Sequence, residues 1–81
     1  MITVKVQLFA IGREIVGRAE LELSLSDDAT AQTVIDLLKA RYPKFQSVKT
    51  LAVAIGTDYA DPQTKLHDGD ELAIIPPVSG G

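Results

Sequence analysis

Of the 81 residues in the chain, 46% are hydrophobic and 23% are charged, as in an ordinary soluble globular domain. A chain this short disfavours an enzyme that encloses an active site of its own. Its net charge is −3, and its basic residues and four aromatic residues are scattered, so we expect no binding to nucleic acid. It has no cysteine, which excludes disulfides, thiolate metal sites and a cysteine nucleophile and is compatible with the cytoplasm, where we expect the protein.

The chain begins with two segments in which apolar and polar side chains alternate strictly. Apolar side chains occupy the even positions of residues 2–8 and the odd positions of residues 19–25. This period of two is typical of half-buried strands. The connection between them contains Gly12 and Gly17, and the two strands are predicted to pair as an antiparallel hairpin.

A helix is predicted to follow the hairpin. Thr30 is its expected N-cap, and Asp27 and Asp28 place carboxylates favourably before the helix start. An apolar stripe at helical spacing follows, and Pro43 ends the helix because proline restricts the residue before it and cannot donate a backbone hydrogen bond. Residues 44–50 are predicted to form a short helical turn and a loop.

Alternation returns at residues 51–55, where small residues between the large ones are typical of a strand that is covered on both faces or closely approached on one. We expect a connection with a short strand near Tyr59, a tight turn around Gly69, and a last strand at residues 72–75. This order predicts an α+β domain of the β-grasp (ubiquitin-like) type, a mixed sheet with one main helix packed across it. We place the domain at residues 1–77 and a flexible Gly-Gly tail at residues 78–81.

Membrane and metal sites are not expected. No apolar stretch approaches the roughly 20 residues that span a bilayer, and the first residues lack the basic and apolar segments of a signal peptide. His67 is the only histidine, which makes a transition-metal site or a catalytic triad improbable. The nearby acidic residues lack the ligand spacing of a calcium loop and are better explained by turn formation.

The candidate reactive group is the carboxylate of the last residue. Gly80 and Gly81 have no Cβ atoms, so the tail can extend through a narrow channel towards another protein's catalytic groups. The stiff Pro76-Pro77 pair holds such a tail away from the domain. We therefore predict that Gly81 carries a group into a partner's active site and that Gly80 provides clearance.

Four residues are candidates for docking that partner. Phe9 either belongs to the core or forms an exposed apolar patch with Ile75 and Pro76 near the root of the tail. Arg13 either is a solvated surface residue or offers a planar positive charge to a partner's carboxylate. The sequence pattern leaves both pairs of alternatives open.

Several segments of the chain occur together in one protein family. They are Leu8-Phe9-Ala10, Arg13-Glu14, Gly17, Leu66, Asp68-Gly69-Asp70-Glu71 and Pro76-Pro77-Val78-Ser79-Gly80-Gly81. Together they resemble, from end to end, the small subunit of molybdopterin synthase, a ubiquitin-like sulfur carrier. Members of that family often carry Asn at the position of Gly56.

The resemblance implies a function for the tail. An adenylating enzyme related to ubiquitin activators would use ATP to activate the Gly81 carboxylate, and a sulfur donor (a sulfurtransferase) would convert it to a thiocarboxylate. The tail would then enter the large synthase subunit, where its sulfur passes to a pterin precursor to form molybdopterin. The resemblance thus implies no permanently bound cofactor, no catalysis by this chain alone, and a heterotetramer with the large subunit. The alternatives are a related carrier for thiamine synthesis, tRNA thiolation or protein conjugation, and a pure interaction module.

Overall fold

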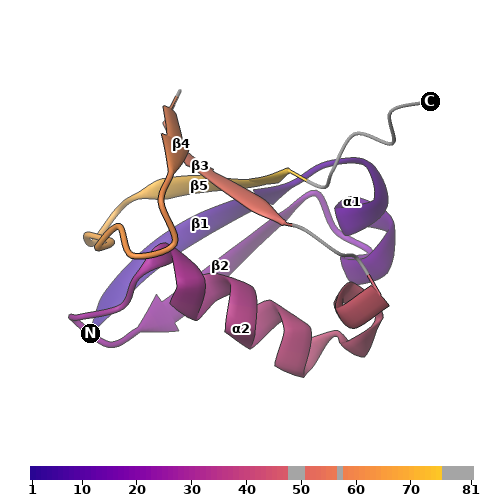
Figure 1. Ribbon diagram of the computed structural model, residues 1–81, viewed down its shortest axis with the longest axis horizontal. Coiled ribbons are helices and arrows are strands. Elements are labelled where there is room, and N and C mark those ends of the chain that lie inside the picture. The colour runs from indigo at the N-terminus through magenta and orange to yellow at the C-terminus, as the bar shows by residue number, and fades with distance from the viewer. Residues whose placement is uncertain (48–50, 57, 76–81) are drawn as a thin grey trace.

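The computed structural model describes residues 1–47, 51–56 and 58–75 and has the predicted α+β architecture (Figure 1). Its elements are β1 (Ile2–Leu8), α1 (Ala10–Val16), β2 (Glu20–Leu25), α2 (Ala31–Arg41), the 3-10 helix η1 (Pro43–Ser47), β3 (Ala52–Ile55), β4 (Asp58–Ala60) and β5 (Glu71–Ile75). The strands form one mixed sheet in the order β2-β1-β5-β3-β4. Helix α2 lies across one face of this sheet, which confirms the predicted fold class (Figure 1).

Strand β1 lies inside the sheet and organises it. It pairs antiparallel with β2, with Val4 opposite Leu23, and parallel with β5, with Leu8 opposite Ile74. Strand β3 then pairs antiparallel with both β5 and β4. The alternating residues of each strand therefore fall on two faces, a core face that α2 covers and an open face on the other side.

The core contains the apolar side chains that the alternation predicts. Its fully buried large side chains are Phe45, Leu8, Leu38, Leu66, Leu72, Ile74, Val4, Val6 and Val34. Both Val53 and Ala54 of β3 are buried although they point to opposite faces, so burial in this strand is not confined to the core face.

Helix α2 begins where its sequence predicts. The Thr30 hydroxyl accepts from the Thr33 backbone N–H, and the Thr33 hydroxyl accepts from the Thr30 backbone N–H, so the two residues form a capping box. The helix ends at Arg41, two residues before Pro43. Capping and proline chemistry together account for both ends of this helix.

The connection between the hairpin strands differs from the prediction, because it contains the seven-residue helix α1. Phe9 occupies the N-cap and provides no side-chain hydrogen bond, so the usual start signal of a helix is missing. Gly12 lies buried against the Phe45 ring and the Leu8 side chain. Packing onto the core, which local sequence signals do not reveal, therefore explains this helix.

Two further findings concern the described residues. No helix among them is long and apolar enough to cross a membrane. Within residues 1–47, 51–56 and 58–75, no three His, Asp or Glu side chains are grouped so that they could hold a metal ion.

Candidate functional site

The predicted reactive residue Gly81, its neighbour Gly80 and the docking candidate Pro76 lie outside the described residues, as does the predicted tail at residues 78–81. The strand that leads to them, β5, is described to its last residue, Ile75. Because β5 is parallel to β1, Ile75 lies at the end of the sheet where β1 passes into α1 (Figure 1). The described part of the site is the surface at this end.

Phe9 and Ile75 are neighbours at this end of the sheet. They directly follow Leu8 and Ile74, which are paired in the parallel register of β1 and β5. Phe9 has extended backbone angles (φ −128°, ψ 155°), so it continues the alternation of β1 onto the open face, and Ile75 points to the same face. The Phe9 side chain is 48% exposed, so it is not a core residue, and the structure brings two of the docking candidates together.

The chain turns sharply after Phe9. Ala10 has a φ of +50°, a left-handed conformation that costs a residue with a Cβ atom about 1 kcal/mol. This residue joins the extended Phe9 to helix α1, which contacts both β5 and η1. The strained junction thus fixes the direction in which the helix leaves the exposed Phe9 ring.

Helix α1 carries two further surface residues beside this end of the sheet. Arg13, the third docking candidate, is exposed, and its backbone carbonyl accepts from the N–H of Gly17, whose φ of +82° ends the helix. Ile11 is 46% exposed and was not selected from the sequence. Ile11 and Ile15 are four residues apart and would share one apolar face of a helix, so no local sequence signal marks Ile11 as exposed.

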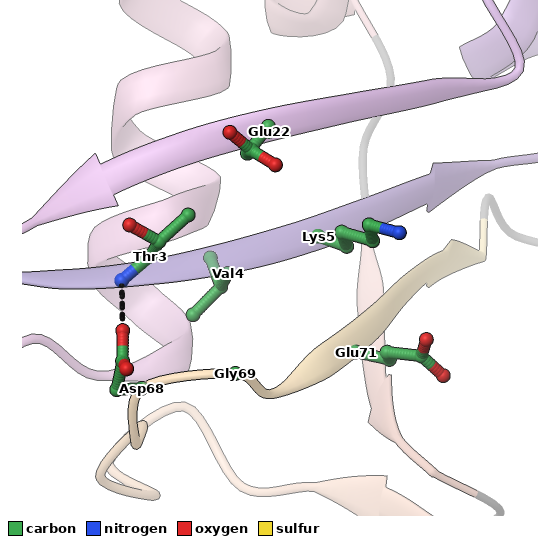
Figure 2. A pocket seen from close by; sticks show the side chains of 7 residues that line it. All are labelled: Thr3, Val4, Lys5, Glu22, Asp68, Gly69 and Glu71. Carbon is green, nitrogen blue, oxygen red and sulfur yellow. Dashed lines mark hydrogen bonds between the residues drawn. The ribbon is translucent and has the colours of Figure 1, made fainter.

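The turn at residues 67–70 fixes the register between β1 and β5. The Asp68 side chain accepts from the Thr3 N–H at 2.7 Å (Figure 2), and the Gly69 N–H donates to the Thr3 carbonyl at 2.8 Å. Asp70 accepts from the Lys5 N–H through its backbone carbonyl at 3.0 Å. The Asp-Gly-Asp segment therefore has a structural role, as turn chemistry predicts, and it holds the parallel register that places Phe9 beside Ile75.

A hollow of about 380 Å³ lies on the open face beside this turn (Figure 2). Its lining residues are Thr3, Val4, Lys5, Glu22, Asp68, Gly69 and Glu71. Lys5 lies between Glu22 on β2 and Glu71 on β5 in the strand register. This hollow lies away from the Phe9 end of β1 and contains no paired nucleophile and base, so we do not assign the chemistry to it.

Gly56, the residue at which the resemblance is interrupted, has a φ of +62° in the turn between β3 and β4. Asn adopts this left-handed conformation more readily than other residues with a side chain. Gly and Asn therefore meet the same backbone requirement at this position. The substitution preserves the shape of the turn and removes one polar side chain from it.

Comparisons with known proteins agree with the fold and extend over the whole chain. Residues 6–81 match the ThiS family. The chain is 43% identical to the molybdopterin synthase sulfur carrier subunit of Chlamydomonas reinhardtii over 96% of this chain and 98% of that protein. It is 37% identical to the Arabidopsis thaliana protein of the same name, over 99% of this chain and 84% of that one.

Solved structures give the same result. A Pyrococcus furiosus protein described as a candidate molybdopterin converting factor subunit 1 has a TM-score of 0.88 and 29% identity, over 96% of this chain and 100% of that one. The small archaeal modifier protein 1 of Methanosarcina acetivorans has a TM-score of 0.82 and 32% identity, over 100% and 98%. Subunits 1 and 2 of the Helicobacter pylori molybdopterin-converting factor were solved as a complex. The chain of that complex that matches has a TM-score of 0.68, over 99% of this chain and 100% of that one, and at 22% identity it is similar in fold alone.

Proposed function

The chain belongs to the ThiS family, among the molybdopterin synthase sulfur carrier subunits, and from this we propose that it carries sulfur on the carboxylate of Gly81 for molybdenum cofactor biosynthesis. The observation that carries the proposal is the 43% identity to such a subunit over nearly the full length of both chains. The described geometry supports it, because β5 leads towards the tail from the end of the sheet that also presents Phe9.

The proposed reaction has two stages, and neither requires a catalytic residue within the described domain. A carboxylate is a poor acyl donor, so an adenylating enzyme first joins the Gly81 carboxylate to the AMP part of ATP and releases pyrophosphate. The terminal sulfur of a persulfide on the sulfur donor then attacks the acyl group and displaces AMP, and a thiol cleaves the resulting acyl disulfide, which leaves a thiocarboxylate and a disulfide on the donor. ATP is thus a substrate of the activating enzyme, and this chain holds no cofactor of its own.

In the second stage the tail enters the large synthase subunit, where the sulfur passes to the pterin precursor. The acids, bases and anion-binding groups of that step belong to the partner. Phe9, Ile75 and Pro76 supply an apolar contact at the root of the tail, and Arg13 supplies a positive charge on α1 beside it. Gly80 provides clearance in the channel, and the two subunits assemble as a heterotetramer in the cytoplasm.

Intact-protein mass spectrometry tests the first stage. The chain is incubated with ATP, an adenylating enzyme of the ubiquitin-activator class and a sulfur donor. We expect one oxygen to be replaced by sulfur, and the change to map to the peptide that contains Gly81. A variant that lacks Gly81 is the matched control, and it should fold normally and stay unmodified. An unchanged mass with an enzyme that is competent on another carrier would contradict the proposal.

A second function is favoured by one specific observation, the 32% identity to a small archaeal modifier protein. Such a modifier would be joined through Gly81 to an amine of another protein. The same experiment separates the two functions, because conjugation increases the mass by that of a whole protein and leaves no thiocarboxylate. A pure interaction module, in contrast, would keep its binding function when Gly81 is removed.

A further inference from the structure

Strand β2 has a free edge. It is the first strand in the sheet order, and among the described residues it pairs with β1 alone, along Glu20–Leu25. The backbone of Leu8 donates to the carbonyl of Ala19, and hydrogen-bonded pairs alternate along an antiparallel ladder. Residues 21, 23 and 25 therefore direct their backbone groups towards β1, and residues 20, 22 and 24 direct theirs outward.

The outward residues are Glu20, Glu22 and Ser24, and all three are exposed. No hydrogen bond within the described part of the chain uses the backbone N–H or C=O groups of these residues. The edge therefore offers three donors and three acceptors in the spacing of a strand, which is the arrangement that an added strand requires.

The charge of this edge selects its partner. The side chains of Glu20 and Glu22 lie on the open face, where Glu22 is opposite Lys5 in the register. Lys5 makes no ion pair within 4.0 Å with any described carboxylate, although Glu71 flanks it on the other side (Figure 2). The carboxylates of Glu20, Glu22 and Glu71 outnumber the single ammonium group of Lys5, so the patch carries a net negative formal charge.

We propose that the free edge of β2 accepts an extended segment of a partner protein as a sixth strand, with Lys or Arg at the positions that face Glu20 and Glu22. Opposite charges at directly opposing positions stabilise a pair of strands, and like charges destabilise it. A second copy of this chain fits poorly, because antiparallel pairing centred on Glu22 places that carboxylate opposite its own copy. The proposal does not depend on the sulfur-carrier function, since the edge lies on the opposite side of β1 from β5, the strand that leads to the tail.

An NMR titration of the ¹⁵N-labelled full chain tests this proposal. The probe is a blocked hexapeptide of alternating Lys and Val, and the matched control is the same peptide with Glu for Lys. With the Lys peptide we expect the amide signals of Glu20, Glu22 and Ser24 to shift and their hydrogen exchange to slow by about tenfold. The amides of Leu21 and Leu23 already bond to β1, so their exchange should change much less.

Three variants make the test specific. Glu22→Lys should weaken binding of the Lys peptide by roughly tenfold, because one charge pair changes from attraction to repulsion. Asp36→Lys on α2 changes the net charge equally but lies in the other layer, so binding should stay within about twofold. Ser24→Pro removes one outward N–H without removing a hydrogen bond to β1, and it should also block binding. If Ser24→Pro does not fold, the Glu22→Lys result alone decides whether the peptide binds at the edge of β2.

Three results would overturn the proposal. The first is equal binding of the Glu and Lys peptides. The second is binding of the Lys peptide with signal changes confined to other residues, such as those around Phe9. The third is sedimentation that shows a dimer of the free chain, together with amides of Glu20, Glu22 and Ser24 that are already protected from exchange without peptide.

Discussion

Gly12 offers a prediction whose sign depends on the structure. It is the third residue of α1, it is buried, and its φ is not in the left-handed region. A Cβ atom added there would lie 3.7 Å from Phe45 Cε1 and 3.8 Å from Leu8 Cδ2, which is ordinary van der Waals contact. Gly12→Ala therefore removes the entropic cost of glycine in a helix and adds contacts without a clash.

The expected gain is about 1 kcal/mol, since a helical glycine costs roughly 0.5–1 kcal/mol relative to alanine. For a domain of this size that corresponds to an increase in Tm of about 5 °C. Thermal and urea unfolding followed by circular dichroism would measure both values. Gly69→Ala is the contrasting variant, because Gly69 has a φ of +86°, and it should lose about 1–2 kcal/mol. A lower Tm for Gly12→Ala would refute the description of α1 and of its packing on Phe45.

Three further predictions concern the surface. Phe9→Ala should weaken binding to the large synthase subunit by about 2 kcal/mol, which calorimetry would measure as a roughly 30-fold loss of affinity. Tyr59→Ala is the control: it removes an aromatic side chain that is 73% exposed on β4 and should leave the affinity unchanged. Gly56→Asn should change the free energy of unfolding by less than about 0.5 kcal/mol because both residues adopt the left-handed turn, whereas Gly56→Val should cost over about 1 kcal/mol; urea unfolding compares the two. A shared hydrogen bond of 2.8 Å raises the pKa of the Met1 amine and lowers the pKa of the Asp27 carboxyl. The small stabilisation from this hydrogen bond is therefore fully present at pH values between the ordinary pKa of an aspartate and that of an α-amine. It is lost as the pH falls through the lowered pKa of Asp27, and also as the pH rises through the raised pKa of Met1. Unfolding measured across pH should lose this dependence in Asp27→Asn, and an unchanged profile would show that the pair does not contribute.

The fold was predictable where local chemistry and the global fold agree. Alternation at residues 2–8 and 19–25, the Thr30 cap and the Pro43 stop each have one structural interpretation, and all are confirmed. Helix α1 was not predictable because its N-cap residue is Phe9, its interior contains Gly12, and its seven residues are too few to be stable alone. It exists because Phe45, more than thirty residues later, provides the surface on which it packs.

The candidate site was predictable in part for a related reason. The alternation ends at Leu8, so the sequence could not decide whether Phe9 is buried. The extended backbone of Phe9 and the register that Asp68 and Asp70 impose decide it, and these are long-range features. The roles of all four candidates in docking stay predictions, because exposure and proximity do not identify a contact and Pro76 lies outside the described residues.

The strand directions explain how so small a domain can serve as a carrier. Because β5 is parallel to β1, it ends at the end of the sheet where Phe9 is exposed, so an exposed apolar side chain lies beside the strand that leads to the tail. An antiparallel β5 would release the chain at the opposite end of the sheet, where β1 begins. The Asp68 and Gly69 hydrogen bonds to Thr3 hold the parallel arrangement from that opposite end. Substitution of Asp68 should therefore weaken partner binding through the position of Phe9, although the two residues lie at opposite ends of β1.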